Sequence, residues 1–144
     1  MAQLFPHFSD EEANRSLMAV VSEEELKATL ASFQKDKSPG PDGWTIEFFI
    51  ALYDFLGGDL LKAVEDIRIS GRNLASFNAT FIALIPKTDS SSSLNDFRAI
   101  SLCNCVYKVV TKIISRRIKV VISRHISEEQ FGFLEEGRFM KLLG

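Results

Sequence analysis

The stretch "KSPGPDGW", residues 37–44, contains two prolines and two glycines within eight residues. Proline removes a backbone donor and glycine reaches conformations that other residues avoid, so the stretch predicts a stiff loop. Ser22 with Glu25 forms a capping-box pattern that begins a helix before the loop, and Pro39 and Pro41 are expected to end it. An ordinary turn between helices and a preformed loop that meets a partner both fit this pattern.

Two further helices are predicted after the loop. Thr45 can cap a helix over "IEFFIALYDFL", whose apolar residues on most sides predict that it is buried. Gly57 and Gly58 are expected to end this helix. Asp59 can then cap a helix over "LLKAVEDIRIS", which Gly71 is expected to close.

The second half of the sequence predicts one strand and one long helix. The apolar, β-branched run "ATFIALIP", residues 79–86, is typical of a strand, and the polar "TDSSSSLND" that follows is typical of a loop. A helix is predicted over about Val106 to Arg124. Its apolar stripe comprises Val106, Val110, Ile114, Ile118 and Val121, and its basic stripe comprises Lys108, Lys112, Arg116 and Lys119. The expected fold is α+β, mostly helical, with a short β element.

Charge is distributed unevenly along the chain. Residues 1–96 carry eight Lys or Arg against fifteen Asp or Glu, whereas residues 97–144 carry nine against four. A basic second half suits a polyanionic partner, but two halves that attract each other would show the same distribution. On pattern alone, a basic stripe on a helix is more often just its solvent-facing side.

Cysteine and histidine are too few to build a disulfide framework or a four-ligand zinc site. The cysteines are Cys103 and Cys105, and the histidines are His7 and His125. Reduced thiols of an intracellular protein are the simplest interpretation, although nucleus and cytoplasm cannot be distinguished. No apolar run approaches the ~20 residues of a membrane span, so no membrane association is expected.

Four short motifs follow one another in a fixed order: "KSPGPDG" (37–43), "FIALIPK" (81–87), "DFRAISLCN" (96–104) and "QFGFLEEGR" (130–138). Each motif is weak alone. Together, over about residues 22–140, they resemble the fingers region of reverse transcriptases from non-LTR (LINE-type) retrotransposons, closest to the plant elements. The resemblance implies a linker-like segment at 1–21 and a partial reverse-transcriptase domain at 22–144, with the palm missing.

The resemblance also implies candidate binding residues. Lys87 and Arg98 would bind the phosphates of an incoming nucleotide, since an ammonium and a planar guanidinium both pair with phosphate oxygens. The residues implied in template-primer contact are Lys37, Ser38, Pro39, Gly40, Pro41, Asp42, Gly43 and Arg138. From the residues alone, Lys87 is an ordinary surface lysine and Arg98 pairs with Asp96 or another carboxylate.

Catalysis by this family uses palm aspartates that converge on two metal ions. The sequence contains no aspartate after Asp96 and no Phe-Ala-Asp-Asp motif, so we expect no catalytic residue, no metal ligand and no polymerase activity from this chain alone. Mg²⁺ is expected only for the complete polymerase.

The resemblance implies RNA and an RNA–DNA template-primer as partners. The missing palm, or another protein, is expected to cover an exposed apolar face. Two other interpretations remain open at this point: a non-catalytic protein-interaction module, and a non-functional retroelement remnant.

Overall fold

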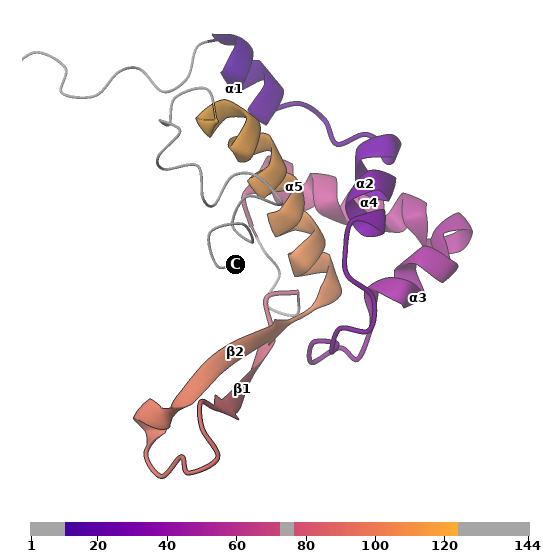
Figure 1. The fold of residues 1–144 in the computed structure, drawn as a ribbon. Helices are drawn as coiled ribbons and strands as arrows, with labels where there is room; N and C mark the ends of the chain where they lie inside the picture. Colours follow the sequence, from indigo (N-terminus) through magenta and orange to yellow (C-terminus); the bar gives the residue numbers. More distant parts are fainter. Residues whose placement is uncertain (1–10, 73–76, 124–144) are drawn as a thin grey trace, which may run out of the picture. The chain divides into compact units, whose positions relative to one another are not determined.

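The computed structural model describes residues 11–72 and 77–123. In chain order the elements are α1 (Glu11–Leu17), α2 (Glu23–Ala31), α3 (Ile46–Ala51), α4 (Tyr53–Ser70), β1 (Thr80–Pro86), the 3₁₀ helix η1 (Leu94–Asp96), β2 (Phe97–Cys103) and α5 (Cys105–Ile122). The fold is α+β and mostly helical, as predicted, with one small antiparallel sheet (Figure 1). The chain forms two compact units, residues 21–112 and residues 1–20 with 113–144.

Helix α2 begins as the sequence predicts but ends earlier. The hydroxyl of Ser22 accepts a hydrogen bond from the Glu25 backbone N–H at 3.1 Å, which caps the helix. The helix ends at Ala31, where the Ser32 backbone N–H turns back to the carbonyl of Thr29 at 3.2 Å. The expectation that Pro39 and Pro41 end this helix is therefore wrong, because several non-helical residues separate its end from the first proline.

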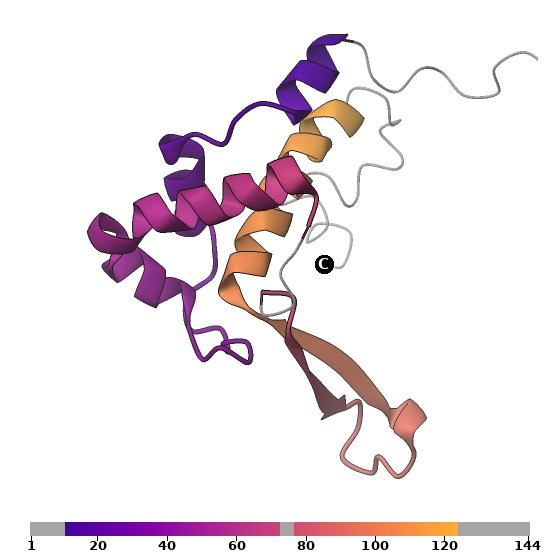
Figure 2. The ribbon, with the colours of Figure 1, turned by 180° about the vertical axis from the view of Figure 1, so that it is seen from behind.

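The break between the next two helices lies at Leu52 rather than at the glycine pair. Thr45 caps α3 through its hydroxyl, as predicted, but Leu52 leaves helical torsions with ψ at 22°. Gly57 and Gly58 lie inside α4, which runs on without interruption in the view of Figure 2. A glycine inside a helix costs only about 1 kcal/mol relative to alanine, so packing of the rest of α4 overrides it.

Gly71 ends α4, as predicted, but the apolar residues of α3 and α4 are more exposed than the sequence predicts. Gly71 closes the helix in the left-handed conformation, with φ at 62° and its N–H bonded to the carbonyl of Ile67 at 2.9 Å. The burial expected for the α3 sequence and its continuation is wrong in large part: Ile46 is buried, whereas Ile50 is 42% exposed and Phe55 is 83% exposed.

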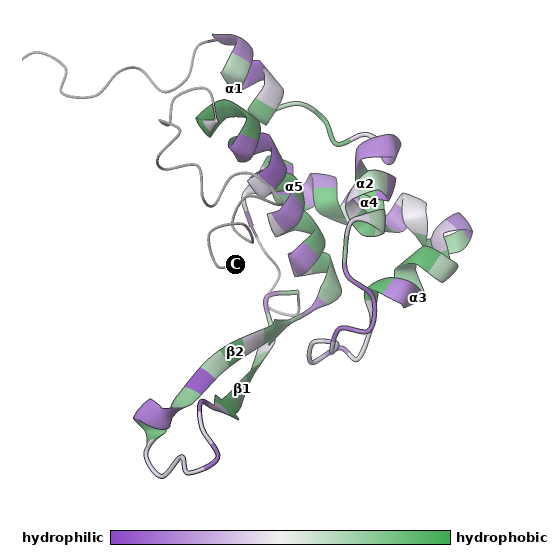
Figure 3. Ribbon diagram, viewed as in Figure 1, coloured by the Kyte–Doolittle hydropathy of each residue, from purple (hydrophilic) through white to green (hydrophobic). Residues whose placement is uncertain are grey.

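Strand β1 confirms the predicted strand, and β2 is its unpredicted partner. The two pair antiparallel, from Thr80 opposite Cys103 to Pro86 opposite Phe97. Proline at the end of β1 fits, because Lys87 bonds across to Asp96 at 2.8 Å and hydrogen-bonded pairs alternate along an antiparallel ladder, so the Pro86–Phe97 pair needs no N–H from residue 86. Hydropathy colouring shows that both strands are predominantly apolar while the tip that joins them is polar (Figure 3).

The core of the larger unit joins α2, α4 and the first half of α5. Leu26 and Leu30 of α2, Val64 of α4 and Val109 of α5 are all nearly or fully buried, and α2, α3 and α4 pack against one another. Burying such a side chain contributes about 1.5–3 kcal/mol. Within the apolar stripe of the long helix, Val106 and Val110 of this unit and Val121 of the smaller unit are buried, whereas Ile114 and Ile118 are exposed.

In the smaller unit, Arg117 joins the described residues of the two chain segments, 11–20 and 113–123. The guanidinium of Arg117, on α5, donates to the carbonyls of Leu17 at 3.1 Å, Ala19 at 2.6 Å and Val20 at 3.4 Å. These carbonyls lie at and beyond the end of α1, where helical partners are lacking. Among the described residues, no helix combines the length and apolar character that crossing a bilayer requires.

Candidate nucleic-acid interface

Lys87 and Arg98 lie together at the tip of the β1–β2 hairpin. Arg98 is opposite Ile85 in the strand register, and the Lys87 N–H extends the ladder to the Asp96 carbonyl at 2.8 Å. Opposite residues in an antiparallel pair share a face, and so do residues two apart along a strand. Lys87 and Arg98 are therefore diagonal neighbours on one face, and the hairpin brings two of the predicted site residues together.

The ammonium of Lys87 is exposed and only partly engaged. It donates to the backbone carbonyl of Asn95 at 2.7 Å, across the turn. An ammonium has three protons to donate, so two remain for a ligand such as a phosphate group. The bond to Asn95 also restricts the side chain, so less conformational freedom is lost when a ligand binds.

The guanidinium of Arg98 is exposed and makes no hydrogen bond or ion pair with any residue that the structure describes. Asp96, its expected alternative partner, instead accepts hydrogen bonds from the backbone N–H groups of Ser92 and Ser93 at 3.0 and 2.9 Å. These bonds lower the pKa of the Asp96 carboxyl below its ordinary value. An ion pair between Arg98 and Asp96 is therefore not formed, and the carboxylate orders the loop.

The loop over residues 37–43 is a compact turn. The Gly43 N–H donates to the carbonyl of Gly40 at 3.0 Å, and Gly43 has φ at 75°, which favours glycine. The carboxylate of Asp42 accepts from the Trp44 N–H at 3.2 Å, which forms the Asx-turn that aspartate commonly makes. The stretch therefore forms a hydrogen-bonded turn with an Asx-turn at Asp42.

Gly40 makes its close approach to the protein itself rather than to an outside partner. It is buried, and a Cβ added to it would lie 2.5 Å from the backbone nitrogen of Asn104 and from the carbonyl carbon of Cys103. Real Cβ contacts are essentially never below 3.0 Å. Glycine at position 40 is therefore required so that the loop can pack on the junction between β2 and α5.

Three polar side chains of α5 and its preceding residue hold this loop and the segment before it. Asn104 accepts from the Asp42 N–H at 3.1 Å, and Lys108 donates to the Ser38 carbonyl at 3.3 Å. Lys112 donates to the carbonyl of Ser32 at 2.9 Å. Residues spaced by four lie on one side of a helix, so the three side chains form a line. We call Asn104, Lys108 and Lys112 the polar latch.

The polar latch corrects the interpretation of the basic stripe as a solvent-facing surface. Lys108 and Lys112 are half-buried, and the Lys112 ammonium also lies 4.2 Å from the ring centroid of Phe33. A cation above an aromatic face is stabilised by the ring's negative potential. The first half of the stripe therefore binds the chain's own backbone. Arg116, in its second half, is exposed.

The remaining predicted loop residues differ in what they offer a partner. Lys37, Ser38, Asp42 and Gly43 are exposed, whereas Pro39 and Pro41 are half-buried. Trp44, at the end of the loop, is 48% exposed and stacks on Phe48 with the ring centroids 4.1 Å apart. The loop therefore presents a short basic and aromatic surface on a hydrogen-bonded backbone.

Arg138, the last predicted contact residue, lies outside the described residues. Among residues 11–72 and 77–123, no cluster of three His, Cys, Asp or Glu side chains could hold a metal ion. Of the two cysteines, Cys103 is half-buried and Cys105 is buried, and both are free thiols. Burial raises the pKa of the Cys105 thiol to about 12.

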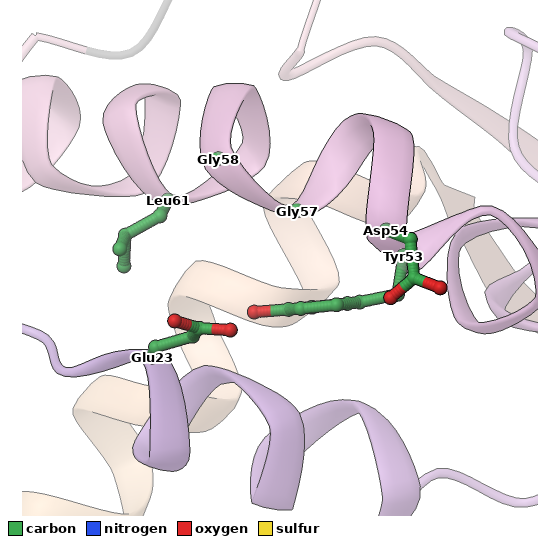
Figure 4. A pocket seen from close by; sticks show the side chains of 6 residues that line it. All are labelled: Glu23, Tyr53, Asp54, Gly57, Gly58 and Leu61. Carbon is green, nitrogen blue, oxygen red and sulfur yellow. The ribbon is translucent and has the colours of Figure 1, made fainter.

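A small hollow between α2 and α4 is separate from these residues. It has a volume of about 230 Å³ and is lined by Glu23, Tyr53, Asp54, Gly57, Gly58 and Leu61. Figure 4 shows the Tyr53 ring lying along α4, with its hydroxyl towards Glu23. That hydroxyl has no hydrogen-bond partner in the described structure, and burial raises its pKa. None of the predicted site residues lines this hollow.

Sequence reasoning missed Asn104 and Trp44 as parts of the interface. Asn104 ends the motif "DFRAISLCN", but no local feature of the sequence shows that its side chain contacts Asp42. Trp44 follows the loop directly, and a lone tryptophan after a Pro- and Gly-rich turn was the available signal. The long sequence separation explains the first omission, since spacing rules apply only within one element.

Comparison with known proteins relates the chain to a transposon. No protein-family model matches the sequence. A protein of Xenopus laevis, described as the transposon TX1 uncharacterized 149 kDa protein, is 32% identical over 120 residues. The matched region covers 83% of this chain and 9% of that protein. The chain therefore shares its descent with a transposon protein, of which it spans a small part.

Proposed function

We propose that the chain is a piece of an RNA-directed DNA polymerase from a non-LTR retrotransposon, closest to the plant elements. In this proposal it is the fingers region, which contacts the template-primer and the phosphates of the incoming nucleotide. The ordered motifs and the similarity to a transposon protein support this origin. The partners are RNA and an RNA–DNA hybrid inside the cell, and the complete polymerase would add Mg²⁺.

The observation that carries the proposal is the pairing of Lys87 and Arg98 on one face of the hairpin tip. Two cations spaced diagonally on a strand pair, at roughly 7–8 Å between Cα atoms, can bind oxygens of neighbouring phosphate groups. The Arg98 guanidinium is exposed without a partner among the described residues, so no ion pair has to break before it binds. The strand pairing already orders the backbone on which both residues lie, which limits the entropy that binding costs.

The second contact is the loop over residues 37–43. Lys37 is exposed and offers a phosphate-binding ammonium. The hydrogen bonds of Asn104 and Lys108 to the loop backbone hold the turn in place beside it. Contacts of this kind go to the sugar-phosphate backbone and carry no sequence preference. The hairpin and the loop are therefore proposed to bind a hybrid of any sequence.

We also propose that the chain alone does not extend primers. Two-metal nucleotidyl transfer needs carboxylates that converge on the ions, and the sequence contains no aspartate after Asp96. Incubation of the purified chain with primer, template, nucleotides and Mg²⁺ is expected to leave the primer at its original length. Extension that depends on Lys87 and Arg98 would overturn this part of the proposal.

The binding proposal is tested with a fluorescently labelled RNA–DNA hybrid at low and moderate salt. Three phosphate contacts, from Lys37, Lys87 and Arg98, predict that affinity falls about 40-fold between ~50 and ~200 mM salt. Lys87→Gln with Arg98→Gln should weaken binding at low salt and flatten this salt dependence. Each single variant, Lys87→Gln and Arg98→Gln, is compared with the control Lys62→Gln on α4, which also removes one charge, from a lysine that is 78% exposed and paired with Asp59. An equal loss in the control would show that general charge, not the hairpin, binds the hybrid.

A second candidate function is a protein-interaction module. Both faces of the hairpin carry exposed apolar residues: Phe81, Ile85 and Ile100 on the face of Arg98, and Ile82 and Leu84 on the other. Exposed apolar surface of this kind marks interaction sites, and the palm of a complete polymerase is the occupant that the polymerase proposal expects. Self-association that persists at high salt, together with no binding of the hybrid, would favour this candidate. A broad, non-cooperative melt would instead favour a non-functional remnant.

A further inference from the structure

Asn104 occupies the point where three elements of the larger unit meet. It follows Cys103, the last residue of the strand that carries Arg98, and precedes Cys105, the first residue of α5. Its backbone carbonyl accepts the Lys108 N–H at 3.1 Å, which is the first turn of α5. Asn104 therefore lies in the helix N-cap position, where asparagine is among the preferred residues.

The side chain of Asn104 contacts the third of these elements, the loop over residues 37–43. Only 3% of the residue is exposed, and its Oδ1 accepts from the Asp42 N–H at 3.1 Å. Gly40 lies so close to Asn104 that no side chain fits between them. The loop over 37–43 is thus fixed to the residue from which the hairpin strand and α5 both extend.

The other two members of the polar latch extend this fixation along α5. Lys108 holds the carbonyl of Ser38, before the turn, and Lys112 holds the carbonyl of Ser32, at the end of α2. Each bond involves a charged donor, which makes it stronger than a bond between neutral groups. Three hydrogen bonds therefore join the segment 32–42 to Asn104 and to one side of α5. The segment runs in the opposite direction to the helix, because the bonds pair the later residues of α5 with the earlier residues of the segment.

We propose that Asn104 is a positioning residue that holds the 37–43 loop at the base of the β1–β2 hairpin, so that loop and hairpin bind one hybrid together. This inference rests on the proposed function, since it concerns how its two contacts cooperate. Two contacts held in fixed geometry bind one ligand better than two contacts that move independently, because the second contact requires little further ordering. Loss of the Asn104 bond should therefore weaken the contribution of Arg98, although the two residues do not touch.

The experiment is a double-mutant cycle of hybrid binding at ~50 mM salt, with Arg98→Gln, Asn104→Leu and the double variant. In the wild-type background Arg98→Gln should weaken binding about tenfold, as expected for one charge-assisted contact. In the Asn104→Leu background the same change should weaken binding less than about threefold. Asn104→Asp keeps an acceptor and a good N-cap, so it should restore the full effect of Arg98→Gln. Gly40→Ala disturbs the same contact from the loop side and should act like Asn104→Leu.

Hydrogen exchange of the Asp42 amide separates this inference from the proposed function. The amide should be protected in the wild type and in Asn104→Asp, and should exchange faster in Asn104→Leu, whether or not a hybrid binds. Hybrid binding with additive effects of the two substitutions would overturn the inference and leave the proposed function intact. Absence of salt-dependent binding in the wild type would overturn the proposed function and the cooperation of its contacts. An Asp42 amide without protection would refute the contact with Asn104 itself.

Discussion

The Oδ1 atom of Asn104 accepts a hydrogen bond from the backbone N–H of Asp42 at 3.1 Å, across 62 residues of sequence. This bond joins the first of the four sequence motifs to the third. It shows that "SPGPDG" and "ISLCN" form one structural feature in this chain, a turn packed on a helix N-terminus. Mutations in either motif should therefore affect the same part of the molecule.

Two glycines of the larger unit should respond to alanine in opposite directions. A Cβ at Gly40 would collide with the backbone of Cys103 and Asn104, so Gly40→Ala should lower the free energy of unfolding by about 1–3 kcal/mol. Gly58 lies inside α4 with nothing within 4 Å of an added Cβ. Gly58→Ala should raise the free energy of unfolding by about 0.5–1 kcal/mol, because alanine favours a helix more than glycine does.

Urea denaturation of both alanine variants measures these changes against the wild type. The pair contains its own control, since each variant adds the same methyl group. A destabilising Gly58→Ala, or a neutral Gly40→Ala, would contradict the packing described for α4 or for the loop.

Two lysines of the basic stripe should differ in their effect on stability. Lys112 donates to the Ser32 carbonyl and lies over the Phe33 ring, so Lys112→Met should lower the free energy of unfolding by about 1–2 kcal/mol. The side chain of Lys119 has no such contact among the described residues, and Lys119→Met should change stability by less than about 0.5 kcal/mol.

Chemical denaturation at moderate salt compares the two lysine variants, both of which remove one charge from α5. Equal losses would show that Lys112 acts only through net charge. The result also bears on nucleic-acid binding, since a lysine engaged with its own backbone has fewer protons to offer phosphate.

The order of the hairpin tip should depend on acid. The carboxylate of Asp96 accepts hydrogen bonds from Ser93 and Ser92, which lower its pKa from the ordinary 3.8. A group whose pKa is lowered on folding stabilises the fold above its unfolded pKa, and that stabilisation is lost as pH falls through the folded pKa. The tip should therefore stay ordered at pH 4 and above and loosen only at more acidic pH.

Carbon-detected NMR of the Asp96 carboxyl measures this titration directly. Asp96→Asn should remove the acid transition of the Ser92 and Ser93 amides, while Asp89→Asn in the same loop should leave it in place. A midpoint for Asp96 at or above 3.8 would contradict the hydrogen-bonded tip.

The two thiols should react at very different rates. Burial raises the pKa of Cys105 to about 12, and the thiolate is the reactive form, so Cys105 should stay unmodified at pH 8 until the chain unfolds. Cys103 is only half-buried and should react first. A thiol assay of the wild type, Cys103→Ser and Cys105→Ser assigns the two rates, and fast modification of folded Cys103→Ser would refute the burial of Cys105.

Local signals in the sequence predicted much of this fold. The helix caps at Ser22 and Thr45, the closing glycine Gly71 and strand β1 depend on neighbouring residues alone, and all four are confirmed. The break at Leu52 was not predicted, because no proline or glycine marks it and packing of α4 outweighs the low helix propensity of Gly57 and Gly58.

The candidate interface was less predictable because its contacts are distant in sequence. The face shared by Lys87 and Arg98 follows from a strand register that requires β2, and β2 was not predicted. Lys108 and Lys112 looked like a solvent-facing stripe because their partners are backbone carbonyls, which composition does not reveal. The charge pattern of a helix indicates which side is polar but not what that side meets.

The central claim is that the loop and the hairpin tip bind a nucleic-acid backbone, and the single tryptophan of the sequence tests it most directly. Trp44 ends the loop and is 48% exposed, so its fluorescence reports on this site alone. Titration with an unlabelled RNA–DNA hybrid at ~50 mM salt should change the emission saturably, more weakly at ~200 mM salt and in Arg98→Gln. Emission that stays constant throughout the titration at low salt would contradict the account.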